Sequence, residues 1–173
     1  RRPFNPMVNA GAIAISSLFP GDTLDSRSEA MLATLSRFAG RQLKIDETVF
    51  RSEASTGHRN RAIAYLLLNA GMLEVDPEAA LDTYFRQCSV LVNTMDLAVM
   101  AATLANAGIN PRTGERAVLV ETIPDVLTVM LTCGMYDYAG QWAFEAGLPA
   151  KSGVSGGVIA VVPGQFGIAA YSP

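Results

Sequence analysis

The sequence predicts an α+β fold in which helices fill most of the chain and an antiparallel hairpin follows them. Apolar residues recur at the three- and four-residue spacing of amphipathic helices over much of the first 146 residues. Two apolar runs, 158–162 and 166–171, are joined by Pro163-Gly164, a pair typical of a tight turn between strands. Half of the residues are apolar and 17% are charged, which indicates a packed globular chain.

Start and stop signals place the individual helices. The first run, 10–19, is apolar on almost every side, which predicts a helix buried within a larger body. Ser26 and Glu29 have capping-box spacing before the next run, which closes at Gly40. Asp76-Pro77-Glu78 combines a cap residue with proline at the first helical position. The other expected helices cover one or two turns within 43–54 and residues 59–70, 77–88, 95–107, 124–131 and 138–146.

Charge and cysteine usage exclude several classes of function. The net charge is −3 and the basic residues are scattered, so no nucleic-acid partner is expected. No apolar run approaches the roughly 18 residues of a membrane span. Cys88 and Cys133 lack framework spacing, which favours free thiols in a reducing, cytoplasmic location, with one disulfide as the alternative. His58 is the only histidine, so neither a metal site nor a Ser-His-Asp triad is expected unless His58 itself serves.

The ends of the sequence suggest a longer protein. The chain opens on Arg1-Arg2-Pro3 without methionine, and it ends at Pro173 directly after an expected strand. No repeat, low-complexity segment or linker divides it. We therefore interpret residues 1–173 as a single domain that is truncated at both ends.

A Gly-rich segment directly before the hairpin is the first candidate site. It begins with Lys151-Ser152-Gly153 and continues through Val154 to Gly157. Lys-Ser/Thr-Gly at a sheet edge belongs to serine hydrolases that use Ser-x-x-Lys as nucleophile and base, but a Gly-rich linker before a strand explains it equally. A phosphate loop would need to precede a helix instead, so nucleotide binding is not expected.

Other candidates are polar residues in apolar or tightly turned settings. Asn9, at the start of the first helix, is either a structural cap or a ligand-binding amide. Glu53 and Asn60 flank a junction where they would face one cleft or lie in a solvated loop. Tyr84 lies on an amphipathic helix, where a lone aromatic residue is more often core or rim than catalytic. Tyr136 follows Gly134 on a tight turn, where functional hydroxyls often occur.

Four motifs occur together in order: Asn5-Pro-Met-Val-Asn9-Ala-Gly-Ala, Leu91-Val-Asn-Thr-Met-Asp-Leu-Ala98, Cys133-Gly-Met-Tyr136 and Gly147-Leu-Pro-Ala-Lys151-Ser-Gly-Val154. From Arg2 to Pro173 the chain resembles the serine-dependent glutaminase family. The resemblance implies a β-lactamase/transpeptidase-like α+β fold, seen as a mostly helical portion plus a C-terminal β-hairpin. In that family the Ser-x-x-Lys segment lies upstream, and none of these 173 residues forms that motif. The resemblance also implies a C-terminal helix beyond Pro173 that packs on the sheet.

The resemblance implies hydrolysis of L-glutamine to L-glutamate and ammonia through a glutamyl-serine intermediate. It implies no metal or organic cofactor, and a homo-oligomer. Glu53 would pair with the substrate ammonium, the Val154 N–H would join the oxyanion hole, and Tyr84 and Tyr136 would be catalytic, with Tyr136 relaying a proton to ammonia. Lys151, Ser152 and Gly153 would line the cleft. The implied glutamine-binding residues are Asn9, Glu53, Asn60, Tyr84, Tyr136 and Val154.

Two alternatives remain open at this point. One is another Ser-x-x-Lys hydrolase acting on β-lactams or peptides, although Glu53 and Asn60 suit a free amino acid better. The other is a non-catalytic fragment, because the nucleophile is missing from the sequence. Residues 1–173 alone are accordingly expected to be inactive.

Overall fold

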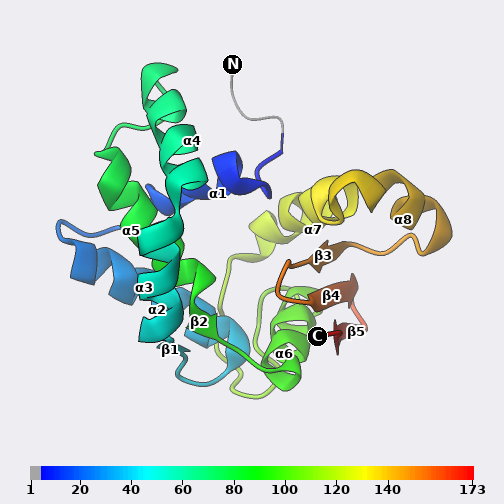
Figure 1. Cartoon of the computed structure of the whole chain (residues 1–173). Helices are drawn as coiled ribbons and strands as arrows, with labels where there is room; N and C mark the ends of the chain where they lie inside the picture. Colours follow the sequence, from blue (N-terminus) through cyan, green and yellow to red (C-terminus); the bar gives the residue numbers. More distant parts are fainter. Residues whose placement is uncertain (1–4) are drawn as a thin grey trace. The chain divides into compact units, whose positions relative to one another are not determined.

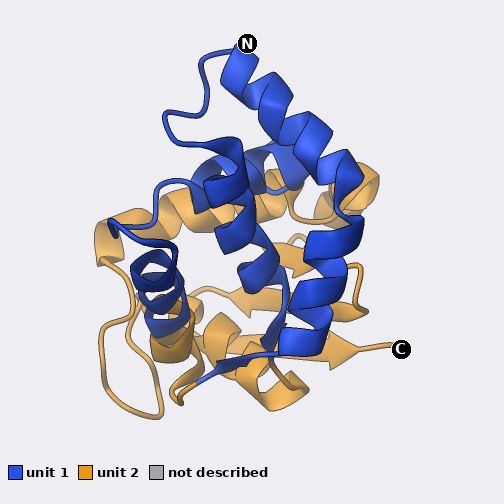
Figure 2. Ribbon diagram, turned by 60° about the vertical axis from the view of Figure 1, so that its left-hand side comes forward, with its two compact units in different colours: residues 1–33, 43–91 blue, residues 34–42, 92–173 orange. Residues whose placement is uncertain are grey.

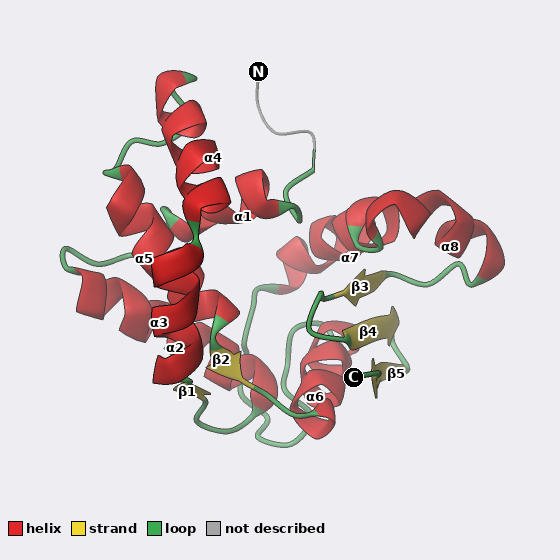
Figure 3. Ribbon diagram, in the orientation of Figure 1, coloured by secondary structure: helices red, strands yellow, loops and turns green. Residues whose placement is uncertain are grey.

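A computed structural model describes residues 5–173, and its residues group into two compact units (Figure 2). The first unit contains the residues up to 33 and 43–91, and the second contains 34–42 and 92–173. Residues 1–4, where the predicted domain begins, lie outside the described residues. Figure 3 shows that most of the regular secondary structure is helical. Within 5–173 no helix combines the length and apolar character needed to cross a membrane.

The first unit is a helical cluster with one short antiparallel ladder (Figure 1). Helix α2, Leu24–Ala39, begins in this unit and its last residues belong to the second. The ladder pairs Lys44 with Leu91. Buried side chains of α1, α4, α5 and the loop between α4 and α5 form the core: Ile13, Ala64, Leu67, Leu73, Ala80, Leu81 and Phe85. The remaining elements are α1 (Asn9–Ser16), β1 (Lys44–Ile45), α3 (Glu47–Thr56), α4 (His58–Asn69), α5 (Pro77–Cys88) and β2 (Val90–Leu91).

Local capping explains where these helices begin and end. The Asp76 carboxylate accepts from the Ala79 N–H at 3.1 Å and Pro77 opens α5, as predicted. Helix α4 closes at Gly71, whose φ of 68° is a conformation that glycine adopts without a steric penalty. The Met72 N–H then bonds to the Leu67 carbonyl at 2.9 Å, so the predicted C-terminal cap is confirmed.

Three local predictions were wrong in the first unit. Helix α2 starts two residues before Ser26, because Thr23 and Ser26 each accept the other's backbone N–H at 3.1 Å. Helix α3 has ten residues rather than one or two turns. Helix α1 ends at Ser16, three residues before the predicted end at Phe19.

The second unit combines three helices with a three-stranded antiparallel sheet (Figure 1). Helix α6 packs on β4 and β5, and α7 contacts β3. The predicted hairpin is present, with Ala160 opposite Ile168, and β3 pairs with its other side through Ala150 and Ala160. The elements are α6 (Thr94–Ala105), η1 (Val120–Thr122), α7 (Ile123–Cys133), η2 (Tyr136–Tyr138), α8 (Ala139–Glu145), β3 (Ala150–Ser152), β4 (Gly157–Val162) and β5 (Phe166–Tyr171).

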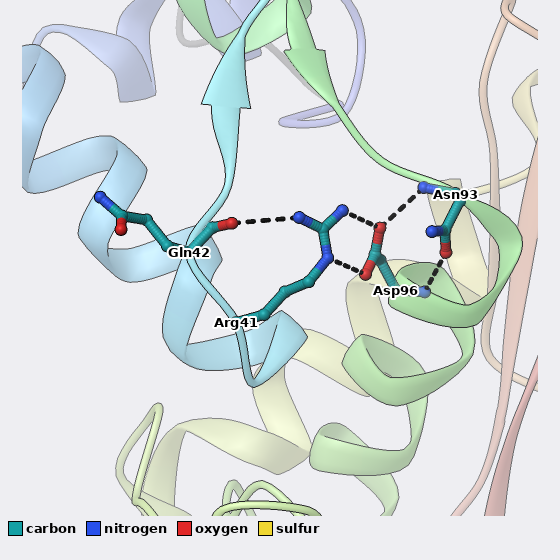
Figure 4. A network of polar contacts seen from close by, with 4 residues as sticks. All are labelled: Arg41, Gln42, Asn93 and Asp96. Atoms are coloured by element: carbon teal, nitrogen blue, oxygen red, sulfur yellow. Dashed lines mark hydrogen bonds and ion pairs between the residues drawn. The ribbon is translucent and has the colours of Figure 1, made fainter.

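An ion pair between the buried Asp96 carboxylate and the exposed Arg41 side chain fixes the start of α6. Both oxygens of Asp96 receive hydrogen bonds from Arg41, each at 2.6 Å, and one also accepts the Asn93 N–H at 2.8 Å (Figure 4). The Asn93 side chain in turn accepts the Asp96 N–H, which completes a capping box. Asp96 is 2% exposed. The Arg41 hydrogen bonds, assisted by the Asn93 N–H, hold the pKa of Asp96 below its ordinary value despite desolvation.

We expect Asp96→Asn to lower the free energy of unfolding at pH 7 by about 2 kcal/mol, because a charge-assisted bond to Arg41 is lost. Because the pKa of Asp96 is lowered by folding, its contribution is present above about pH 4 and is lost as the pH falls through the folded value. Urea unfolding at several pH values checks this. Wild type and Asp96→Asn should converge in acid, whereas a constant difference, or an equal loss in the exposed control Asp22→Asn, would contradict the assignment.

Candidate functional site

Asn9 and Asn60 form the best-defined polar pair of the first unit. Asn9 is the first residue of α1, and its Nδ2 donates to Oδ1 of Asn60 on α4 at 2.8 Å. Val8 is the N-cap, without a side-chain cap bond, so the structural-cap interpretation of Asn9 is wrong. The bond leaves the Asn9 carbonyl oxygen as an acceptor and the Asn60 amide as a donor. The pair therefore presents an acceptor oxygen of Asn9 next to a donor NH2 group of Asn60.

Glu53 and Tyr84 lie in the same neighbourhood of the first unit, around Cys88. Glu53 is half-buried on α3, so the interpretation as a solvated loop is also wrong. Desolvation raises the pKa of the Cys88 thiol most strongly, a hydrogen bond with Tyr84 lowers it, and the Glu53 charge raises it further. Cys88 was not among the predicted site residues. Cys88 lies four residues after Tyr84 on one helix, and this spacing indicates that the two side chains are neighbours.

In the second unit, Tyr136 stands on a turn pressed against β3. The Ser152 N–H donates to the Gly134 carbonyl at 3.1 Å. A Cβ atom at Gly134 would lie 1.8 Å from the Ala150 carbonyl oxygen, so a side chain is excluded there. Tyr136 has a positive φ of 53°. Among the described non-glycine residues, only Ala107 also has a positive φ. Such strained backbone is concentrated at functional sites.

Lys151 and Ser152 are on β3, at one edge of the three-stranded sheet in the order β3-β4-β5. The linker interpretation is therefore wrong, because this segment pairs with β4, with Lys151 opposite Ile159. Lys151 Nζ lies 4.4 Å from the centroid of the Tyr136 ring. Lys151, Ser152 and Gly153 line a pocket of about 250 Å³ together with residues of α6 and β4. The sheet edge thus presents a cation, a hydroxyl and a phenol.

Val154 follows β3 in the turn that leads to β4. The turn closes through a bond of 2.8 Å from the Gly153 N–H to the Gly157 carbonyl. Val154 is 98% exposed, and its N–H donates to no acceptor among residues 5–173. An unpaired backbone N–H beside a pocket is the type of donor that binds a developing oxyanion.

The structure brings the predicted site residues together within each unit. Asn9 contacts Asn60, Glu53 and Tyr84 share the surroundings of Cys88, and Tyr136 contacts Lys151. Cys88 and Cys133 are free thiols. Within residues 5–173 no group of three His, Cys, Asp or Glu side chains is arranged to hold a metal ion.

Comparison with known proteins gives consistent results over the whole chain. A family model described as Glutaminase matches residues 1–173. A glutaminase of Trichormus variabilis is 58% identical over 173 residues, which cover 100% of this chain and 52% of the relative. The chain therefore spans about half the length of the curated relatives it matches.

Solved structures agree in fold. A probable glutaminase, ybaS, matches with a TM-score of 0.96 and 47% identity, covering 99% of this chain and 55% of that one. Bacillus subtilis glutaminase YbgJ, solved as a covalent complex with 5-oxo-L-norleucine, matches with a TM-score of 0.90 and 41% identity over 96% of this chain and 59% of its own. The predicted β-lactamase/transpeptidase-like α+β fold is confirmed.

The contact between the Gly134 turn and β3 can be tested by adding one methyl group. We expect Gly134→Ala to lower the free energy of unfolding by about 1–3 kcal/mol, because the added Cβ meets backbone that has to move. Gly140→Ala is the matched control, since a Cβ there meets nothing within 4 Å and alanine favours helix α8. Urea unfolding of both variants measures the difference. Equal stability of the two variants would contradict the close approach.

Proposed function

We propose, because the chain belongs to the glutaminase family, that its protein hydrolyses L-glutamine to L-glutamate and ammonia. The match of all 173 residues to glutaminases is the observation that carries this proposal. Since the chain spans about half of its relatives, the activity is proposed for the whole protein.

The residues that the family resemblance assigns to the amino-acid end of glutamine belong to the first unit. Glu53 offers a half-buried carboxylate to the α-ammonium group. Asn9 and Asn60 restrain each other through their 2.8 Å bond, so each amide would bind substrate at a low further cost in side-chain entropy. Tyr84 would add its hydroxyl from helix α5.

The residues that the resemblance assigns to the chemistry of the side-chain carboxamide belong to the second unit. Attack on the carboxamide carbon places negative charge on its oxygen, and the free Val154 N–H would donate to that oxygen. Tyr136, on its strained turn, would pass a proton to the nitrogen as the C–N bond breaks, so that ammonia leaves. Lys151, Ser152 and Gly153 would line this part of the site.

The nucleophile would be a serine of the Ser-x-x-Lys type, and none of these 173 residues forms that motif. Its hydroxyl proton would pass through the lysine of that motif and Tyr136 to the departing nitrogen. Its oxygen would bond to the carboxamide carbon as ammonia leaves, giving a glutamyl ester. Water would then break the ester, release glutamate and return the proton to the serine. The covalent complex of the related Bacillus subtilis enzyme supports an intermediate of this kind. The scheme uses no metal or organic cofactor.

The remaining proposals concern partners and location. L-glutamine is the proposed substrate, further copies of the chain are the proposed protein partners, and the proposed location is the cytoplasm. The two free thiols are compatible with a reducing compartment.

Ammonia release by the full-length protein tests the proposed reaction. L-glutamine should be hydrolysed at an enzyme-like rate, L-asparagine much more slowly, and a chromogenic β-lactam not at all. Ring opening of the β-lactam without ammonia release from glutamine would overturn the proposal.

For Tyr136→Phe in the full-length protein, we expect kcat to fall about 10²–10⁴-fold with a much smaller change in KM, because the proton relay is removed. Tyr138→Phe is the matched control on the same turn, since its hydroxyl bonds to Glu145 at 2.6 Å. Steady-state glutamine kinetics measure both variants. A near-normal kcat in Tyr136→Phe would remove this tyrosine from the chemical step.

For Glu53→Gln, we expect kcat/KM for glutamine to fall by at least about 30-fold, corresponding to about 2 kcal/mol for a desolvated charge partner of the ammonium group. Glu47→Gln changes an exposed carboxylate on the same helix and should leave the kinetics unaltered. Kinetics and thermal melts on both variants distinguish recognition from folding. Normal kinetics with a lower melting temperature would make Glu53 structural.

A further inference from the structure

The surroundings of Lys151 give this residue a more specific role than lining a pocket. The sequence contains only two lysines, Lys44 and Lys151. The ammonium group of Lys151 lies over the Tyr136 ring, 4.4 Å from its centroid, and donates to the Ser152 carbonyl oxygen. A cation at this position is attracted to the electron-rich ring face.

Lys151 makes these contacts in place of an ion pair. Lys151 forms no salt bridge within residues 5–173, and the half-buried side chain has lost part of its hydration. That desolvation lowers the pKa of Lys151. The ring face and the carbonyl oxygen therefore replace water around the charge, which favours one location of the ammonium group.

Tyr136 is the more exposed partner of this contact. It is 45% exposed, and its backbone has a positive φ on a three-residue turn. Lys151, by contrast, is in the middle of β3, paired with Ile159 of the central strand β4. The contact thus connects a partly exposed aromatic side chain to a strand that is paired within the sheet.

We propose that Lys151 is a positioning residue, whose ammonium group holds the Tyr136 ring so that its hydroxyl is aligned for proton transfer to the leaving nitrogen. The inference rests on the proposed glutaminase function. It assigns Lys151 no bond to substrate and no proton transfer of its own. Since chemical steps depend steeply on orientation, small displacements of a catalytic group reduce the rate strongly.

The first test compares three variants of the full-length enzyme. Lys151→Met removes the charge at similar size and should lower kcat about 10- to 100-fold while KM changes little. Lys151→Arg keeps a cation that also stacks on aromatic rings, so most of the lost kcat should return. Lys44→Met, at an exposed position on β1, is the matched control and should leave kcat unchanged. A normal kcat in Lys151→Met, or no recovery with arginine, would overturn the proposal.

The second test asks whether Lys151 acts through the Tyr136 hydroxyl. In a Tyr136→Phe background the hydroxyl is already absent, so adding Lys151→Met should lower kcat by less than about 3-fold. The two substitutions would then be strongly non-additive. The same fold-loss in both backgrounds would show that Lys151 acts independently of Tyr136 and would overturn the proposal.

An NMR measurement that does not depend on catalysis tests this inference separately from the proposed function. In protein carrying ¹³C-tyrosine, the ring signal of Tyr136 is assigned by its loss in Tyr136→Phe. That signal should shift in Lys151→Met and return towards its original position in Lys151→Arg. An unchanged signal would overturn the contact even in an active enzyme. A shifted signal in a protein that releases no ammonia would support the contact while the proposed function fails.

Discussion

The close approach of the Gly134 turn to strand β3 is the constraint on which the second unit's candidate site depends. The absence of a side chain at residue 134 lets the turn touch the Ala150 carbonyl and bond to the Ser152 N–H. Tyr136 lies two residues further on, in a backbone conformation that costs about 1–3 kcal/mol for a non-glycine residue. Sheet pairing of β3 on one side and the turn on the other hold the phenol beside Lys151.

Hydrogen bonds within each unit use some atoms of the candidate site residues and leave others available to a ligand. Asn9 and Asn60 each satisfy one amide group of the other and keep one for a ligand. The Val154 N–H is available because the turn closes through Gly153 and Gly157 instead. Asp96, in contrast, uses both oxygens within the protein and serves to fix the start of α6 beneath the sheet strands β4 and β5.

Local signals made much of the fold predictable. Asp76-Pro77 and Gly71 cap helices through neighbouring backbone groups. The two apolar runs on either side of Pro163-Gly164 predict the hairpin by their sequence pattern alone. Strand β3 was missed because three residues, two of them polar, show no period. The Arg41–Asp96 pair joins residues 55 positions apart, and no local pattern reports such a contact.

The candidate site was predictable mainly through resemblance. Residue chemistry alone left Asn9 open between a cap and a ligand-binding amide, and left Glu53 open between a cleft and a loop. The structure excludes the cap and the loop, because Val8 takes the cap position and Glu53 is helical. The contact of Lys151 with Tyr136 depends on the fold bringing the turn to the sheet, so the sequence could not reveal it.

A crystal structure of the full-length protein with bound L-glutamate would test the central claim most directly. The account predicts that a side-chain carboxylate oxygen of glutamate accepts the Val154 N–H at about 2.9 Å, the distance of an ordinary N–H···O bond. The α-ammonium group should pair with Glu53, and the Tyr136 hydroxyl should lie within hydrogen-bond reach of the same carboxylate. Glutamate bound elsewhere, with Val154 and Glu53 facing solvent, would contradict the account.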